Sequence, residues 1–247
     1  MSAALVIDIG NTSTSIGCYR NGKVSAVVHC ASRFESLEET TALITREAVD
    51  AVVIASVVPA VNARWKKAVK AAGLPAPLFI SCKLELGIAV DYPRPDKIGA
   101  DRLANAAAAA RLLGTPSVVC DFGTALTFDI LDAGRGYIGG IICPGLPLMF
   151  DYLAEKTALL PHVEPSRTKA VVGRNTKQAM QIGARLGYRG MVREILLSLE
   201  KDLGVKELPV CCTGGYAGWI FKGWDVAATI DPKLTLRGNG FIGELNR

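Results

Sequence analysis

The chain has 247 residues, 50% of them hydrophobic and 21% charged, and carries a formal net charge of +5 at pH 7. This balance is typical of a folded globular protein and excludes an intrinsically disordered chain. The N-terminus lacks a basic region followed by an apolar core, and the apolar run 51–61 is too short to span a bilayer. We therefore expect a cytoplasmic protein with no membrane partner.

Cysteines and basic residues do not indicate a redox, zinc or nucleic-acid site. The seven cysteines lie mostly in β-like apolar segments without a C-x-x-C pair, and the chain has only two histidines. Reduced core thiols are therefore expected. The one tight basic cluster, at 64–70, follows an amphipathic helical pattern that is typical of a solvated face, so we expect no nucleic-acid partner.

The first half of the chain predicts the element order βββαβαβα. Periodicity and turn residues place its elements, in chain order, as strands over 4–10, 14–20 and 23–31, a helix over 36–48, a strand over 51–58, a helix over 62–72, a strand over 77–82 and a helix over 101–113. The last helix is alanine-rich and ends at a turn around Gly114.

The second half repeats this scheme. Its expected elements are strands over 117–122, 126–131 and 137–143, a helical segment after Pro147, a long helix over 175–203, a strand over 210–212, a short helix after Gly214-Gly215 and a last strand near 226–230. A repeat of this size indicates duplication of a whole domain, since a solenoid needs shorter and more numerous repeats. We predict two domains, 1–114 and 115–247.

Each half opens with the same small motif, and the two copies lie 113 residues apart. The first copy is Asp8-Ile9-Gly10-Asn11-Thr12 and the second is Asp121-Phe122-Gly123-Thr124. Each places a carboxylate at the end of a strand, a glycine where backbone can approach a ligand closely, and a polar side chain beside it. One copy alone is an ordinary turn, but two copies in equivalent settings indicate that both grip the phosphates of one nucleotide.

The duplicated order, with D-x-G in each first hairpin, resembles the actin-like ATPase superfamily, which includes sugar kinases and chaperone ATPases. The resemblance implies an α/β fold of two ribonuclease H-like (βββαβαβα) domains, with ATP in an interdomain cleft. The segments 8–12 and 121–125 would be its first and second phosphate segments.

A wider set of motifs resembles the type III pantothenate kinases in order and spacing over nearly the whole chain. Its members are D-x-G-N-T at 8–12, G-x-D-R at 99–102 after a Tyr-Pro segment, D-F-G-T-A at 121–125, the glycine-rich run 139–145, Leu160-Pro161, 173–176 and Thr213-Gly214-Gly215. The resemblance implies ATP-dependent phosphorylation of the primary hydroxyl of pantothenate to 4′-phosphopantothenate, the first step of coenzyme A biosynthesis.

The resemblance also assigns roles to individual residues. Asp101 would be the catalytic base that accepts the hydroxyl proton. The substrate-binding residues would be Tyr92, Gly99, Ala100, Asp101, Arg102 and Thr176, with Thr176 reaching the pantothenate of the neighbouring subunit in a homodimer. The ATP-binding residues would be Asp8, Ile9, Gly10, Asn11, Thr12, Ser13, Thr14, Ser15, Thr124, Gly214 and Gly215. Asp8 would organise Mg²⁺ through water, and Asp121 would hold a monovalent cation, K⁺ or NH₄⁺.

Several of these residues also have structural explanations. Asp101 is a favoured residue at a helix start, Tyr92 before a proline can anchor a rigid loop, and Thr176 with Asn175 can begin the long helix. Within that helix Ala179, Gly183 and Gly187 leave a smooth stripe for close packing of another backbone, in the same chain or in a second subunit.

Two other functions are compatible with the fold. One is a catalytically silent regulatory accessory factor, although an interaction protein has no need for three carboxylates at phosphate-facing positions. The other is a kinase for another small hydroxylated metabolite, or an ATPase or exopolyphosphatase, which would share the phosphate segments but differ in the acceptor site. The sequence departs from expectation at the first phosphate segment, which has no lysine or arginine after Thr12, and at Tyr216, which is large for a residue beside an adenine.

Overall fold

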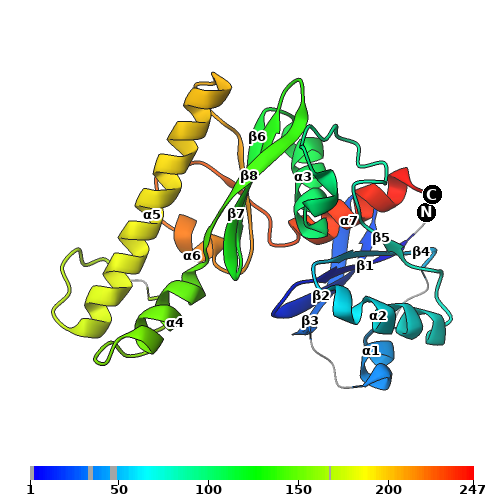
Figure 1. Ribbon diagram of the computed structural model, residues 1–247, viewed down its shortest axis with the longest axis horizontal. Helices are drawn as coiled ribbons and strands as arrows, with labels where there is room; N and C mark the ends of the chain where they lie inside the picture. The colour runs from blue at the N-terminus through cyan, green and yellow to red at the C-terminus, as the bar shows by residue number, and fades with distance from the viewer. Residues whose placement is uncertain (1–2, 33–35, 45–48, 167) are drawn as a thin grey trace. The chain divides into compact units, whose positions relative to one another are not determined.

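The computed structural model describes residues 3–32, 36–44, 49–166 and 168–247 (Figure 1). The chain folds into two compact units. The first unit contains Met1–Thr115, Ala133–Gly139 and Lys233–Arg247, and the second contains Pro116–Asp132 and Gly140–Pro232. The main division therefore falls one residue from the predicted boundary, but a hairpin tip and the C-terminal segment join the first unit.

The first unit is built on a five-stranded sheet with the order β3-β2-β1-β4-β5. Its strands are β1 (Ala4–Ile9), β2 (Ser13–Arg20), β3 (Lys23–Ala31), β4 (Ala51–Ser56) and β5 (Leu78–Phe79). The central strand β1 pairs antiparallel with β2 and parallel with β4. Asn21 and Gly22 join β2 to β3 with φ angles of 52° and 76°, the left-handed pair that the Asn-Gly signal predicts.

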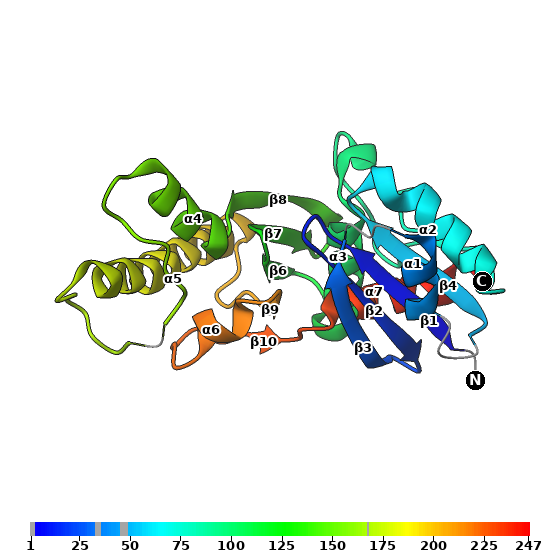
Figure 2. The ribbon, with the colours of Figure 1, turned by 90° about the horizontal axis from the view of Figure 1, so that it is seen from below.

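Helices cover both faces of this sheet (Figures 1 and 2). They are α1 (Leu37–Ile44), α2 (Pro59–Ala71), α3 (Ala100–Leu113) and α7 (Leu234–Leu245), and a 3₁₀ turn, Pro95–Lys97, precedes α3. Val52 and Ile54 of β4 belong to the buried cluster under α1 and α2. Val53 points to the opposite face, where a Cβ on Gly243 of α7 would lie 2.6 Å from its side chain.

The helix α7 was not predicted, because its glycines lower helix propensity. Those glycines instead let α7 pack very closely: a Cβ on Gly238 would lie 1.9 Å from the Ala104 carbonyl oxygen of α3, and one on Gly240 would lie 2.1 Å from the Tyr19 ring. The buried face of α7 packs on β1 and α3. The predicted second domain included residues 233–247, but these residues pack in the first unit.

The second unit repeats the sheet, with the order β10-β9-β6-β7-β8. Its strands are β6 (Ser117–Phe122), β7 (Ala125–Asp132), β8 (Gly136–Pro144), β9 (Val210–Thr213) and β10 (Thr229–Ile230), and its helices are α4 (Leu146–Lys156), α5 (Thr176–Leu203) and α6 (Ala217–Phe221). β6 pairs antiparallel with β7 and parallel with β9. β1 and β6 have the same length and burial pattern, and only their fifth residues, Asp8 and Asp121, are partly exposed. The duplicated α/β fold is confirmed.

Smaller differences concern element ends and thiols. The helix predicted over 36–48 is described from Leu37 to Ile44, and 45–48 lie outside the described residues. The strand predicted over 77–82 contains only two residues, Leu78 and Phe79. All seven cysteines are free, and Cys18, Cys120, Cys211 and Cys212 are buried. In the part of the chain that the structure describes, no helix is long and apolar enough to cross a bilayer.

Candidate active site

The turn between β1 and β2 presents three side chains to solvent at the end of the central strand. The Gly10 amide donates to the Ser13 carbonyl oxygen at 3.1 Å, which closes the turn. Asn11, Thr12 and Ser13 are exposed, and Asp8, two residues before Gly10, is partly exposed. The turn can therefore offer backbone and side-chain donors to an anion beside one carboxylate.

A buried hydroxyl pair holds this turn from behind. Thr14 has no exposed surface, and its Oγ1 lies 3.0 Å from the Ser32 Oγ. The Ser32 hydroxyl donates to the Gly10 carbonyl oxygen, and the Ser32 amide donates to the Thr12 carbonyl oxygen at 3.2 Å. The structure thus gives Thr14 a supporting position, and sequence reasoning missed Ser32.

The remaining residues predicted to bind ATP in this segment differ in accessibility. The Ile9 side chain is fully buried in the core, and its carbonyl oxygen accepts the Val57 amide at 3.1 Å. The Ser15 hydroxyl lies 3.0 Å from the His29 Nδ1. An incoming phosphate can therefore reach Asn11 to Ser13 directly, but not the side chain of Ile9.

A buried amide on α7 supports β1 next to Asp8. The Asn239 Nδ2 donates to the Ile7 carbonyl oxygen at 2.8 Å, and Asn239 has no exposed surface. One turn earlier on α7, the Thr235 hydroxyl donates to the Asn105 Oδ1 of α3 at 2.8 Å. These bonds tie α7 both to the strand that carries Asp8 and to the helix that carries Asp101. No local sequence signal identified them, because the partners are more than a hundred residues apart.

Asp101 lies in the first turn of α3, against a glycine. Its Oδ1 accepts the Arg102 amide at 2.7 Å, and a Cβ on Gly99 would lie 2.5 Å from the same oxygen. A side chain at position 99 would therefore displace the carboxylate. Burial raises the pKa of Asp101, and the hydrogen bond from the Arg102 amide opposes this shift. A carboxylate with a raised pKa is a stronger base towards a hydroxyl proton than an ordinary one.

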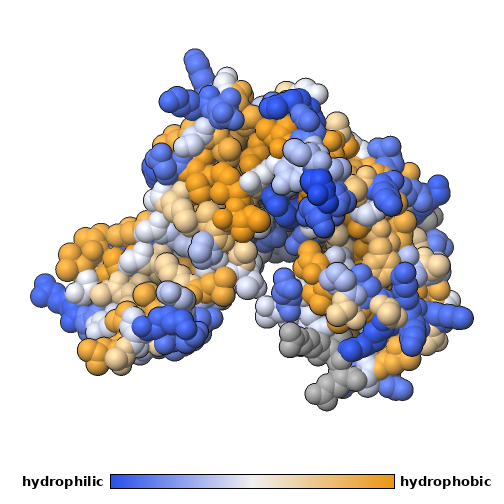
Figure 3. Space-filling model, viewed as in Figure 1, coloured by the Kyte–Doolittle hydropathy of each residue, from blue (hydrophilic) through white to orange (hydrophobic). Residues whose placement is uncertain are grey.

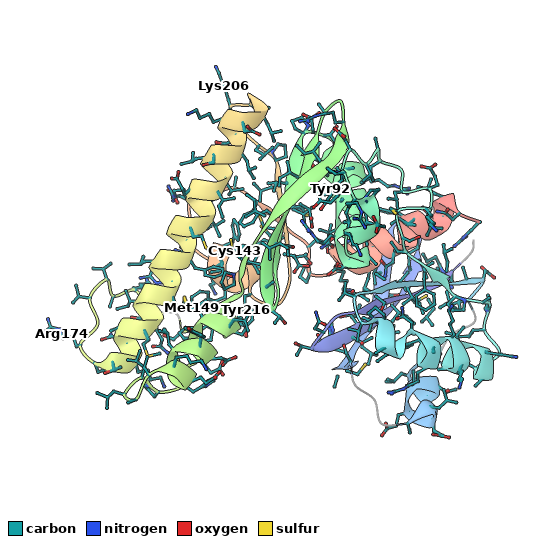
Figure 4. The ribbon with its side chains drawn as sticks, in the orientation of Figure 1. Tyr92, Cys143, Met149, Arg174, Lys206 and Tyr216 are labelled. Atoms are coloured by element: carbon teal, nitrogen blue, oxygen red, sulfur yellow. The ribbon has the colours of Figure 1, made fainter. Side chains whose placement is uncertain are left out.

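Two of the residues predicted to bind the acceptor, Tyr92 and Arg102, contact Tyr137 in the same unit as Asp101. Tyr92, labelled in Figure 4, lies in the segment before α3 and is 38% exposed. Its ring meets the buried Tyr137 ring edge to face, with centroids 6.2 Å apart. The Arg102 guanidinium lies 5.9 Å from the centroid of the Tyr137 ring. Tyr92 and Arg102 were predicted from the sequence, whereas Tyr137, which contacts both, was not.

The turn between β6 and β7 in the second unit is held by its backbone much as the first turn is. The Gly123 amide donates to the Ala125 carbonyl oxygen at 3.1 Å, and the Gly145 amide donates to the Thr124 carbonyl oxygen at 3.1 Å. A Cβ on Gly145 would lie 2.0 Å from that Thr124 oxygen, so only glycine fits there. Thr124 is exposed and Asp121 is partly exposed.

Gly214, the first of the two glycines after β9, lies against the end of β6. Gly214 has a φ of +87°, and a Cβ there would lie 2.6 Å from the Asp121 Oδ1 and 2.5 Å from the Phe122 carbonyl carbon. A Cβ on Gly215, in contrast, would meet no atom within 4 Å. The Tyr216 amide donates to the Phe122 carbonyl oxygen at 3.3 Å, and burial raises the pKa of the Tyr216 hydroxyl. The structure therefore brings Asp121 and Gly214 together within the second unit, and Gly215 follows in an open position.

Thr176 is the exposed first residue of α5 in the second unit. Asn175 caps the helix, since its side chain accepts the Gln178 amide at 2.9 Å, and the Arg174 amide donates to the Gln178 Oε1 at 2.8 Å. Arg174 and Lys206 lie beyond the two ends of α5 in Figure 4. Asn175 therefore has a structural role as the cap of the helix. Thr176 is the first helical residue, and its side chain is exposed.

The donors at the candidate site suit Mg²⁺ that arrives with a triphosphate. Among the described residues no group of three His, Cys, Asp or Glu side chains could hold a metal ion. Mg²⁺ usually keeps several waters and binds one or two carboxylates together with substrate phosphates. A single partly exposed carboxylate at the end of a strand, as at Asp8, fits that manner of binding.

The duplicated α/β fold, with a similar turn after the first strand of each sheet, is also found in known structures. The structure is similar to a conserved Baf family protein from Campylobacter jejuni, described as a transcriptional activator, with a TM-score of 0.63 and 18% identity over 97% of each chain. It is also similar to a protein from Cytophaga hutchinsonii described as a sugar kinase, with a TM-score of 0.51 and 11% identity over 98% of this chain and 99% of the other. At these identities the likeness concerns the fold alone.

Sequence comparison identifies the family. The profile of the type III pantothenate kinases matches residues 4–197. Type III pantothenate kinases from Akkermansia muciniphila and Methylacidiphilum infernorum are 47% and 38% identical, over 80% and 98% of this chain and 79% and 88% of theirs. One from Dehalococcoides mccartyi is 37% identical over the whole of both chains. The chain belongs to the type III pantothenate kinase family, and the predicted resemblance is confirmed.

Proposed function

We propose that this protein transfers the γ-phosphoryl group of ATP to the primary hydroxyl of pantothenate, giving 4′-phosphopantothenate. The observation that carries the proposal is the Asp101 carboxylate, which lies against Gly99 with a raised pKa, in a chain of this family. The test is formation of ADP that depends on pantothenate, with the phosphorylated product identified by mass spectrometry. ADP formation that does not respond to pantothenate would refute the proposal.

The proposed chemistry needs alignment and charge neutralisation more than covalent catalysis, because phosphoryl transfer passes through a loose transition state. Asp101 accepts the hydroxyl proton as the acceptor oxygen attacks. The Arg102 guanidinium would pair with the pantothenate carboxylate. Tyr92 borders the same place, and the backbone of 99–102 completes it.

The triphosphate would be held by the two turns, one in each unit. The amides and side chains of 11–13 and the exposed Thr124 would donate to phosphate oxygens, and Gly214 and Gly215 would lie at the nucleoside. Neither turn contains a lysine or arginine, so bound cations must neutralise much of the phosphate charge. Mg²⁺ at Asp8, bound through water, and K⁺ or NH₄⁺ at Asp121 would supply that charge.

A monovalent cation at Asp121 has a direct test. Added K⁺ or NH₄⁺ is expected to raise turnover at saturating Mg²⁺, and Asp121→Asn is expected to remove most of that stimulation. Wild-type turnover that is independent of both ions would refute this part of the proposal.

We also propose a homodimer that forms through α5, with Thr176 reaching the acceptor site of the partner subunit. The stripe Ala179, Gly183 and Gly187 is exposed, and a Cβ on either glycine would meet no atom within 4 Å. Leu186 beside it is 42% exposed, and apolar residues gather on the face of the second unit that carries β8 and α5 (Figure 3). Exposed apolar surface next to small residues suits close packing of a second helix.

The dimer is tested by placing a large charge on the stripe. Gly187→Arg is expected to give a monomer of about half the wild-type mass in sedimentation, with a raised KM for pantothenate because Thr176 is withdrawn. A fully active wild-type monomer would refute the arrangement. We place the protein in the cytoplasm, which suits its seven free thiols, and propose no nucleic-acid or membrane partner.

Two alternatives have specific discriminating tests. A regulatory accessory factor of the same fold is suggested by the description of the Campylobacter jejuni protein, and pantothenate-dependent ADP formation would exclude a silent role. A kinase for another hydroxylated metabolite, or an ATPase, is tested by competition among pantothenate, N-acetylglucosamine and water as acceptors. Preference for either rival acceptor would replace the pantothenate assignment.

A further inference from the structure

We infer that Tyr137 is a positioning residue of the acceptor site, which holds Tyr92 and Arg102 in place without touching the substrate itself. The inference rests on the proposed function. It concerns a residue that lies 45 positions after Tyr92 in the chain, at the start of β8, and that carries no motif of its own.

The backbone around Tyr137 docks on the segment that carries Tyr92. The Tyr137 amide donates to the Ala89 carbonyl oxygen at 2.9 Å, and the Asp91 amide donates to the Tyr137 carbonyl oxygen at 2.9 Å. These bonds form a parallel bridge between Val90 and Tyr137. Two well-formed hydrogen bonds on one residue fix its position along the segment 89–92.

Glycines on both sides of Tyr137 permit this docking. Gly136 has a φ of +73°, and a Cβ there would lie 2.2 Å from the Ala89 carbonyl oxygen. Gly139 has a φ of +139°, and a Cβ there would lie 3.6 Å from the Tyr92 ring. Gly136 therefore lets the hairpin backbone approach the segment closely, and Gly139 adopts, beside the Tyr92 ring, a backbone conformation that other residues rarely take.

The Tyr137 side chain then contacts both acceptor-site residues. Its ring is fully buried and meets the Tyr92 ring edge to face at 6.2 Å, an arrangement that aromatic pairs prefer. The Arg102 guanidinium lies 5.9 Å from the centroid of the same ring, within the range of a cation–π contact. A rigid buried ring thus limits the rotamers of an exposed tyrosine and of a long arginine, which reduces the conformational entropy lost when the acceptor binds.

Loss of the ring should therefore weaken acceptor binding selectively. Tyr137→Leu is expected to raise the KM for pantothenate about tenfold, from loss of one aromatic pair and one cation–π contact, and to leave the KM for ATP within about twofold. Tyr137→Phe keeps the ring and is expected to stay within about threefold of wild type in both constants.

A matched control separates positioning from general loss of stability. Tyr19 is also a buried tyrosine of the first unit, but its ring packs on Phe241 of α7 at 5.9 Å. Tyr19→Leu should lower the thermal unfolding temperature much as Tyr137→Leu does and leave the KM for pantothenate unchanged. Kinetics are compared well below the unfolding temperature of the least stable variant.

Double-mutant and exchange measurements complete the test. In a cycle of Tyr137→Leu with Arg102→Met, the effects on the KM for pantothenate should be less than additive, because Tyr137 acts through Arg102. Hydrogen exchange of the Asp91 amide should accelerate in Tyr137→Leu and not in Tyr19→Leu, a readout that does not depend on activity. An unchanged KM for pantothenate in Tyr137→Leu, or equal effects of both variants on exchange and KM, would overturn the inference. Absence of pantothenate phosphorylation by the wild type would instead overturn the proposed function.

Discussion

Replacing Asp101 by asparagine tests the catalytic role of this carboxylate with little change in shape. The amide oxygen can still accept the Arg102 amide, which lies 2.7 Å from the Oδ1 in the wild type, so the first turn of α3 should be kept. The amide cannot accept the hydroxyl proton. Loss of a general base is expected to lower kcat by about 10²- to 10⁴-fold, or about 3–5 kcal/mol of activation free energy. The assay is pantothenate-dependent ADP formation at saturating substrates.

The same variant makes an opposite prediction for stability. Because burial raises the pKa of Asp101, the folded chain binds this proton more tightly than the unfolded chain does. The favourable contribution of the protonated acid is present below the unfolded value, about 3.9, and is lost as pH rises through the folded-state pKa. The amide that replaces the carboxyl group does not titrate. The unfolding temperature of the variant should equal that of the wild type in acid and exceed it at neutral pH.

A nearby carboxylate provides the control for both measurements. Asp96 lies in the 3₁₀ turn before α3, is exposed, and bonds to Arg94. Asp96→Asn should keep activity and give no gain in stability at neutral pH, since an exposed ion pair contributes little. Turnover of Asp101→Asn within about threefold of wild type would refute the assignment of the base. An unfolding temperature below that of wild type at neutral pH would refute the argument from burial.

Three further predictions concern a glycine, an amide and a thiol that lie in or behind the two sheets. Gly214→Ala should lower the free energy of unfolding, measured by denaturant titration, by about 1–3 kcal/mol and should weaken ATP binding, because the positive φ of Gly214 and its contact with β6 exclude a side chain. Gly218 of α6 faces open space, so Gly218→Ala should leave the free energy of unfolding unchanged in the same titration. Asn239→Ala should cost about 1–3 kcal/mol by leaving a carbonyl oxygen of β1 without its side-chain donor, as measured by thermal unfolding. Cys120 should resist a thiol reagent in the native protein, because burial raises the pKa of its thiol, while the partly exposed Cys82 should react first; equal rates in mass spectrometry would contradict this.

The features that sequence predicted correctly are encoded over short distances. Both turns that are proposed to bind phosphate follow a buried strand with a glycine at the closing position, and Asn21-Gly22 has the left-handed backbone that this pair favours. Asp101 stands in the first turn of a helix whose alanine run strongly favours helical backbone. In each case the residues that determine the conformation are neighbours in the chain, so local propensity and pattern suffice.

The features that sequence missed depend on partners far away in the chain. Tyr137 contacts Tyr92 and Arg102, and neither is its neighbour in the sequence. The helix α7 forms in spite of its glycines because close packing on α3 and β1 outweighs low propensity. Tertiary packing therefore decides both features, and no window of a few residues contains the information.

The β1–β2 and β6–β7 turns show how one backbone arrangement is maintained by different side chains. In each unit the residue that follows the third strand donates its amide to the last residue of the turn: Ser32 to Thr12, and Gly145 to Thr124. In the first unit the Ser32 hydroxyl also bonds to the turn and to a buried threonine, whereas in the second any side chain at 145 would overlap the Thr124 carbonyl oxygen. The closer approach in the second unit removes the room that a hydroxyl would need. The backbone hydrogen bond is common to both turns, while the side chains behind it are not. The shared feature is therefore the shape of the turn beside a partly exposed aspartate, which the proposed binding of a triphosphate with its cations would use.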